Sequence, residues 1–220
     1  MPLAKKPVYL KDLAAGLNVL WPGNRTYNLV FHGHSVPSGY FRTPHVDTLN
    51  AYPHQTLLSL REKFPFSVVN TIVTAIGGEN SEQGAARFEK EVMNHKPDLL
   101  FIDYGLNDRG IGLNKAELSW KKMIESALKK RVKIILLTPT LDITVSLPDY
   151  RRCPLYKHVL LIKKLAINYN LGLADSFHAS MQYCLSKNTG VNALLSQSNH
   201  PNRKGHSVVA REIMEWFPLD

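Results

Sequence analysis

Five short apolar runs, separated by longer segments with helical periodicity, constrain the fold of this chain more than any other feature. The runs are rich in Val, Ile and Leu and do not alternate with polar residues, which is typical of parallel strands covered on both faces. They span residues 27–33, 67–73, 98–105, 132–139 and, more weakly, 171–175. The helix-like segments span residues 47–63, 81–95, 114–130, 154–169 and 203–216. Alternating strands and helices predict a three-layer α/β/α fold with a five-stranded parallel sheet.

Composition restricts the class of protein further. Hydrophobic residues make up 44% of the 220 residues and charged residues 20%, as in ordinary globular domains. No apolar run approaches the ~20 residues of a membrane span, and the first residues do not form a signal peptide. We therefore expect a cytoplasmic protein, unless a signal has been removed. The absence of repeats and linkers predicts one domain over 27–220, preceded by an N-terminal extension over 1–26.

The net charge of +9 has two interpretations. It could attract an anionic partner, or it could reflect the solvated faces of helices that carry many lysines. The sequence shows no nucleic-acid-binding motif and no CxxC pair, since Cys153 and Cys184 are the only cysteines. We expect solvated helix faces, two thiols rather than a disulfide, and no nucleic-acid or membrane partner. The oligomeric state is not indicated, and a preference for anionic substrates stays open.

Polar residues gather directly after the predicted strands. Each of these segments alone would be interpreted as a turn or loop, because Gly, Asn, Asp and Ser favour turns. The carboxyl ends of parallel strands, however, meet at one edge of the sheet, where the sites of such folds form. The segments are "FHGHSVPSG", "TAIGGENS", "YGLNDRG" and "TPTLD", and "NHPNRKGH" precedes the last predicted helix.

Four of these blocks, taken in order, resemble the SGNH or GDSL-like hydrolases, which are serine esterases, thioesterases and carbohydrate acetyl esterases with a flavodoxin-like fold. The blocks are "FHGHSVPSG", "AIGGENS", "YGLNDRG" and "NHPNRKGH", and the matching region runs from about residue 27 to 216. The resemblance implies that Ser35 is the nucleophile and His200 its base. It also implies an oxyanion hole made by the backbone N–H groups of Ser35 and Gly78 and the side-chain amide of Asn107. Such donors stabilise the negative oxygen of a tetrahedral intermediate.

Two residues depart from the family pattern. His34 stands where the family usually has an aspartate, directly before the serine. Gln197 stands three residues before His200, where the family's triad acid normally lies. A glutamine cannot supply a charge, but a carbonyl oxygen from its side chain or from the loop backbone can accept the Nδ1–H of the histidine. Asp142, which also follows a strand, is a second candidate. We therefore expect a Ser–His dyad.

The segment 39–53 is predicted to line the mouth of the site, with Tyr40, Phe41 and Arg42 as substrate-binding residues. The family resemblance implies hydrolysis of a small acyl ester, above all acetyl, on a carbohydrate or another small molecule. No cofactor and no metal are expected.

Three alternatives stay open. The fold could support an acyltransferase, in which a sugar hydroxyl replaces water as the acyl acceptor. A decayed site would leave a carbohydrate-binding module without catalysis. Finally, His32 and His34 alternate on one strand and therefore share a face, so they could bind a metal with Asp103 or His206 as a further ligand.

Overall fold

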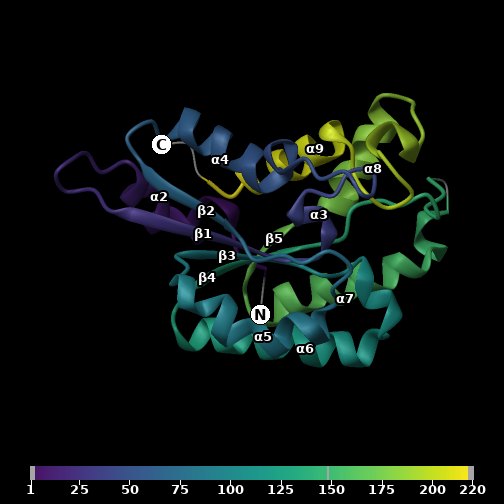
Figure 1. Cartoon of the computed structure of the whole chain (residues 1–220), viewed down its shortest axis with the longest axis horizontal. Helices are drawn as coiled ribbons and strands as arrows, with labels where there is room; N and C mark the ends of the chain where they lie inside the picture. The colour runs from purple at the N-terminus through teal and green to yellow at the C-terminus, as the bar shows by residue number, and fades with distance from the viewer. Residues whose placement is uncertain (1–2, 148, 218–220) are drawn as a thin grey trace.

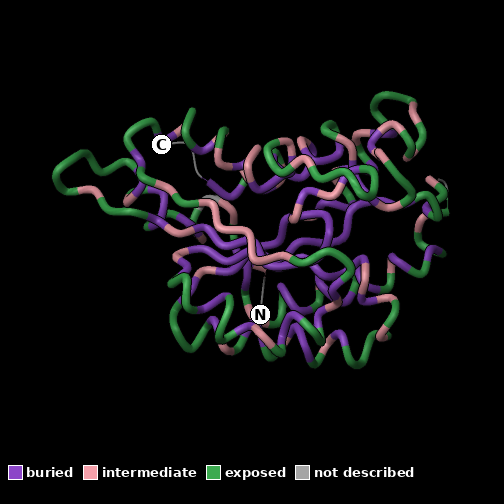
Figure 2. Tube along the Cα trace, viewed as in Figure 1, coloured by how far each residue is buried: buried purple, intermediate pink, exposed green. Residues whose placement is uncertain are grey.

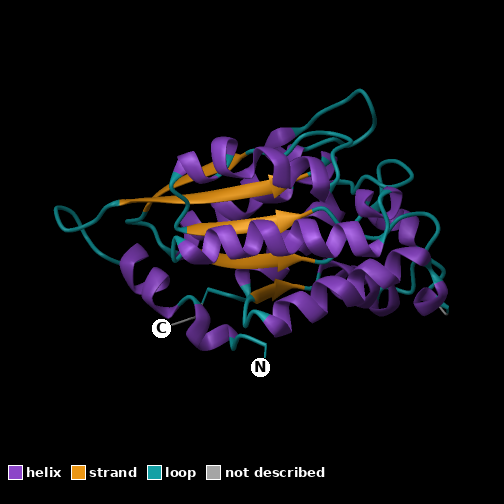
Figure 3. Cartoon of the chain, turned by 90° about the horizontal axis from the view of Figure 1, so that it is seen from below, coloured by secondary structure: helices purple, strands orange, loops and turns teal. Residues whose placement is uncertain are grey.

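A five-stranded sheet in the order β2-β1-β3-β4-β5 forms the centre of the molecule in the computed structural model, which describes residues 3–147 and 149–217 (Figure 1). All four strand pairs are parallel, and the arrows in Figure 3 point the same way. The predicted parallel α/β fold is therefore confirmed. The strands are β1 (Thr26–Gly33), β2 (Val68–Val73), β3 (Leu99–Asp103), β4 (Lys133–Leu137) and β5 (Gly172–Ala174).

Helices cover both faces of this sheet (Figure 1). One layer contains α3 (Ser35–Ser38), α4 (Tyr52–Lys63), α8 (Ser176–Ser186) and α9 (Arg203–Met214). The other contains α5 (Ser81–Glu91), α6 (Leu113–Lys129) and α7 (Pro154–Asn168). Short 3₁₀ turns lie between these elements: η1 (Thr48–Asn50), η2 (Met93–His95), η3 (Asn107–Gly110), η4 (Tyr150–Arg152) and η5 (Val191–Leu194). No helix in the described ranges is long and apolar enough to cross a membrane.

Strand β2 differs from its prediction as a strand buried on both faces. It lies at the edge of the sheet, where Val68 and Asn70 are exposed and the other four residues are half-buried. Figure 2 shows this half-buried strand beside the buried centre of the sheet. An uncharged, Val-rich edge strand has the same sequence pattern as a central one, so the pattern could not separate the two positions.

Besides the short helix α3, two helical regions were not predicted. Helix α8 follows β5 directly, and its apolar residues do not form a long regular stripe. The segment before β1 forms α1 (Lys6–Tyr9) and α2 (Lys11–Leu17), and Leu10, Leu13 and Leu17 are buried in the same core as the sheet. The Tyr9 hydroxyl also accepts a hydrogen bond from the backbone N–H of Ile134 at 3.1 Å. The predicted N-terminal extension therefore packs onto the domain.

The two cysteines are both buried and free, as expected.

Candidate active site

Ser35 lies at the carboxyl edge of the sheet, just beyond the end of β1, which is the neighbour of the central strand β3. Strand β1 ends at Gly33, and Ser35 is the first residue of α3. A side chain at position 33 would place its Cβ 2.4 Å from the carbonyl oxygen of Asp103, so only glycine allows this close approach to β3. The N–H group of a first helical residue has no intrahelical acceptor. Ser35 therefore presents both its hydroxyl and a backbone donor at this edge.

His34 acts as the N-cap of α3. Its Nδ1 accepts a hydrogen bond from the backbone N–H of Val36 at 3.2 Å, which is the bond that a capping carboxylate would accept. Its Nε2 lies 3.4 Å from Oδ1 of Asp103, and both side chains are buried. This accounts for a histidine at the position where the family usually has aspartate. The imidazole supplies the same acceptor to the turn that carries Ser35.

His200 reaches Ser35 from the loop before α9. Its Nε2 lies 3.0 Å from the Ser35 Oγ, and its Nδ1 lies 3.1 Å from the backbone carbonyl oxygen of Phe41. A carbonyl oxygen can only accept, so the proton of a neutral imidazole is held on Nδ1. The Nε2 lone pair then faces the serine hydroxyl. This is the tautomer that a general base requires.

Neither Gln197 nor Asp142, the two predicted orienting side chains, bonds to the Nδ1 of His200 among the described contacts. The Gln197 side-chain oxygen accepts from the backbone N–H of Thr43 at 2.8 Å instead. The Asp142 carboxylate lies 2.6 Å from the Arg109 guanidinium and accepts from the N–H of Thr144 at 2.9 Å. Among the described contacts, neither side chain bonds to the imidazole. Gln197 nevertheless binds the chain two residues beyond Phe41, and so helps to hold the loop that orients His200.

The segments "AIGGENS" and "YGLNDRG", which carry Gly78 and Asn107, form two neighbouring loops beside Ser35. Gly78 is exposed, has a φ of 81°, and faces open space. Its loop is tied to β1 by the Ile76 N–H, which donates to the Gly33 carbonyl at 3.0 Å. The Asn107 side-chain amide donates to the carbonyl of Glu79 at 2.9 Å, which holds the two loops together. The described contacts use one hydrogen of this amide, which leaves the other available to a ligand.

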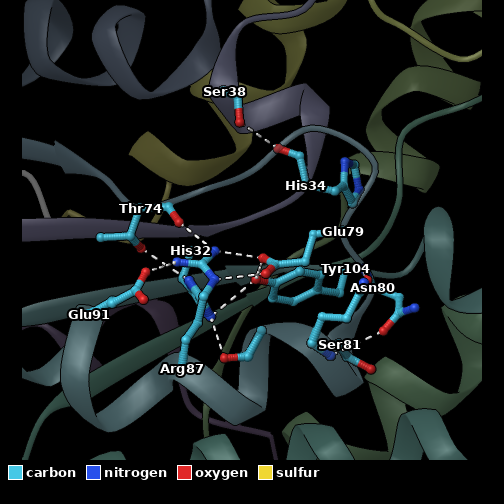
Figure 4. A network of polar contacts seen from close by, with 12 residues as sticks. His32, His34, Ser38, Thr74, Glu79, Asn80, Ser81, Arg87, Glu91 and Tyr104 are labelled. Carbon is cyan, nitrogen blue, oxygen red and sulfur yellow. Dashed lines mark hydrogen bonds and ion pairs between the residues drawn. The ribbon is translucent and has the colours of Figure 1, made fainter.

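A buried polar network lies behind the loop of Gly78 (Figure 4). The Glu79 carboxylate accepts from the Arg87 guanidinium at 2.6 and 2.7 Å and from the Tyr104 hydroxyl at 2.6 Å. Burial acts to raise the pKa of Glu79, but these hydrogen bonds keep that pKa below its ordinary value. Burial lowers the pKa of His32 to about 4, so its imidazole is neutral near pH 7.

The arrangement of the histidines does not match the His-x-His metal site considered from the sequence. Both ring nitrogens of His32 have protein partners: Nδ1 lies 3.0 Å from the Thr74 hydroxyl, and Nε2 lies 3.1 Å from the Tyr104 hydroxyl. The Nδ1 of His206 accepts from the N–H of Tyr52 at 3.2 Å. Within the described ranges, no group of three His, Cys, Asp or Glu residues is arranged to hold a metal ion.

The three predicted substrate-binding residues have different surroundings. Tyr40 is half-buried with its ring centre 6.1 Å from that of His200, and a Cβ on Gly77 would lie 2.8 Å from the Tyr40 ring. Tyr40 therefore lies between His200 and the glycine loop. The Phe41 ring is buried, 4.8 Å from the ring of His206, so it is poorly placed for the predicted contact with substrate. Arg42 is exposed beside the site.

Burial also affects His200 itself. It lowers the pKa of His200 below the ordinary value, and nearby His34 acts in the same direction, while the hydrogen bond to Phe41 opposes the shift. No carboxylate contacts the imidazole among the described residues, so no adjacent negative charge raises the pKa. The imidazole is therefore in its neutral, proton-accepting form at pH 7.

Sequence reasoning did not find several residues that shape this site. The Phe41 carbonyl belongs to the backbone, which carries no residue-type signal. The capping role of His34 was hidden because histidine is an uncommon N-cap. Arg87 lies in the middle of a predicted helix, and its contacts become visible only when the loop before that helix is placed.

A serine whose hydroxyl faces the lone pair of a histidine can form and release an acyl group, which is the chemistry of serine hydrolases. Comparison of the sequence with known protein families identifies the family. Residues 31–208 match the family model described as the GDSL-like lipase/acylhydrolase family. The chain belongs to this family and is a carboxylic ester hydrolase.

Solved structures share this fold at low sequence identity. Axe2, an acetylxylan esterase from Geobacillus stearothermophilus, is 23% identical with a TM-score of 0.75, over 88% of this chain and 95% of that one. A putative GDSL-like lipase from Parabacteroides merdae is 17% identical with a TM-score of 0.74, over 87% of this chain and 95% of that one. A search of curated protein sequences found no match.

Proposed function

We propose that this protein is a serine esterase that removes small acyl groups, above all acetyl, from carbohydrates through a Ser–His dyad. The observation that carries the proposal is the geometry of His200, whose Nε2 lies 3.0 Å from the Ser35 Oγ while its Nδ1 faces the Phe41 carbonyl at 3.1 Å. The backbone carbonyl takes over the orienting function of a triad acid, although it supplies no full negative charge.

The reaction has two steps. The Ser35 Oγ attacks the ester carbonyl carbon while His200 accepts the hydroxyl proton, and the resulting oxyanion is stabilised by the N–H groups of Ser35 and Gly78 and the amide of Asn107. The C–O bond to the sugar then breaks, and the leaving alcohol takes the proton from His200. In the second step, water gives its proton to His200 and attacks the acyl-enzyme. The bond between the acyl carbon and the Ser35 Oγ then breaks, His200 returns its proton to that oxygen, and the carboxylic acid leaves.

Hydrolysis fits the site better than acyl transfer or binding alone. Gly77 and Gly78 are exposed, so water has direct access to the acyl position. A binding module would not require the Ser35–His200 contact. The half-buried Tyr40 ring beside His200 offers an aromatic surface on which a sugar ring can pack.

The structural neighbour Axe2 supports the acetyl group but differs from this chain at the position of the triad acid. Axe2 is described as an acetylxylan esterase, and its catalytic mutants replace a serine, an aspartate and a histidine that follows this aspartate by three residues. The residue three positions before His200 in this chain is Gln197. The proposed dyad is therefore a reduced form of a triad.

We expect the wild-type protein to release acetate from acetylated xylo-oligosaccharides, and the variant Ser35→Ala to release none above background. Acetate measured by a coupled assay, with the sugars followed by mass spectrometry, tests this. Esters with long acyl chains serve as the comparison. If neither acetylated sugars nor simple acetyl esters are hydrolysed by folded protein, the proposed function is wrong.

The pH dependence tests the dyad separately. His200 must be neutral to accept a proton, so kcat/KM falls as the pH drops through the pKa of His200 in the free enzyme. Burial lowers this pKa, so the acid limb is expected below the ordinary histidine value of about 6.5. An acid limb at pH 7 or above would instead indicate a carboxylate close to His200.

A further inference from the structure

The loop from Thr74 to Glu79 carries Gly78, yet little within the loop itself holds it in shape. Gly77 and Gly78 have no side chains to pack, and both are exposed. Glycine also has more backbone freedom to lose on ordering than any other residue. Within the loop, the Glu79 N–H donates to the Ile76 carbonyl at 3.3 Å. The conformation that aims the Gly78 N–H must therefore be held from outside.

Arg87 of α5 contacts both ends of this loop. Its Nη2 donates to the carbonyl of Thr74 at 2.6 Å and to Oε2 of Glu79 at 2.6 Å, and its Nε donates to Oε1 of Glu79 at 2.7 Å. Only 14% of the Arg87 side chain is exposed, so water competes little for these bonds. Figure 4 shows the guanidinium between Thr74 and Glu79. The planar fork of arginine allows this simultaneous contact, which a lysine cannot reproduce.

Glu79 connects Arg87 to the other loops at the carboxyl edge of the sheet. Its carboxylate accepts from the Tyr104 hydroxyl, and Tyr104 directly follows β3. Its carbonyl accepts from the Asn107 amide. Glu79, the residue next to Gly78, is thus bonded both to Arg87 and to Asn107, the side-chain donor of the oxyanion hole. A displacement of Glu79 would move both donors together.

We propose that Arg87 is a positioning residue that fixes the Gly78 loop in the conformation required to bind the oxyanion. This inference rests on the proposed function, because it assigns Gly78 to the oxyanion hole. The oxyanion exists only in the transition state and intermediates, so a misplaced donor lowers kcat and leaves KM nearly unchanged.

The test compares Arg87→Lys with Glu91→Gln. The lysine variant keeps the positive charge beside buried Glu79 but cannot span both ends of the loop. The control removes the negative charge of Glu91, a half-exposed carboxylate that lies 3.1 Å from Nη1 of Arg87 and does not belong to the loop. We expect Arg87→Lys to lower kcat about 10- to 100-fold with KM within about twofold, since an error of about 1 Å in positioning costs up to ~10² in rate. We expect Glu91→Gln to match the wild type.

Hydrogen exchange provides a readout that does not depend on activity. Peptides covering residues 74–80 are expected to exchange faster in Arg87→Lys, while peptides from β3 and β4 keep the wild-type rate. If Arg87→Lys fails to fold, Glu79→Gln replaces it, with the same expected direction in both measurements. A folded variant with wild-type kcat, or with unchanged exchange over 74–80, overturns the inference. A wild-type protein without esterase activity would overturn the proposed function instead, and the exchange result would still decide whether Arg87 holds the loop.

Discussion

Replacing His200 with alanine is expected to lower kcat by about 10⁴- to 10⁶-fold, the range for removing the base of a serine hydrolase. His200 is the side chain found at hydrogen-bond distance from the Ser35 hydroxyl among the described residues, so without it none of them can take the proton as Ser35 attacks. Substrate binding does not depend on this proton, so KM should change little. Initial rates of acetate release under saturating substrate measure the effect.

A matched control comes from an exposed histidine. His178 lies on α8, and its ring nitrogen contacts Gln182 on the same helix. His178→Ala is expected to keep the wild-type rate. If His200→Ala retained a tenth or more of the wild-type kcat while remaining folded, His200 could not be the base, and the dyad would have to be abandoned.

Replacing Asn107 with alanine is expected to have the second largest effect, a loss in kcat of about 10²- to 10³-fold, as for other single oxyanion donors. The side-chain amide of Asn107 adjoins the Gly78 loop through its bond to the Glu79 carbonyl. Its second N–H is free to meet an oxyanion. The missing donor matters most when the carbonyl oxygen becomes negative, so the loss should appear in kcat rather than in KM.

Asn94 provides the control for this substitution, because it is exposed in η2, which precedes β3 and so lies at the opposite edge of the sheet from the site. Asn94→Ala should leave kcat unchanged. Thermal melting of both variants separates a catalytic effect from a folding defect. A kcat for Asn107→Ala within threefold of the wild type would remove Asn107 from the oxyanion hole.

Much of the fold was predictable from the sequence because buried parallel strands have a strong local signature. The Leu, Ile and Val runs that become β3 and β4 are fully or almost fully buried, as their composition predicts. The order of the strands in the sheet has no such local signal. The edge position of β2 therefore appeared only in the structure.

The candidate site was predictable where its chemistry resides in side chains within short ordered blocks. Ser35 and His200 are 165 residues apart in sequence, and the structure brings them to 3.0 Å. The partner of His200 could not be predicted in the same way, because a backbone carbonyl such as that of Phe41 is present in every residue. The family's spacing to His200 predicts Gln197 as a direct partner of the imidazole, but the Gln197 side chain binds the backbone N–H of Thr43 in the Phe41 loop instead.

The central claim is that Ser35 is a nucleophile activated by a histidine without a neighbouring carboxylate. Intact mass after exposure to a fluorophosphonate probe, with the adduct mapped by peptide analysis, tests it most directly. We expect one adduct on Ser35 of the wild type, none in Ser35→Ala, and a strongly reduced labelling rate in His200→Ala. No adduct on folded wild-type protein, or an adduct on another residue, would contradict it.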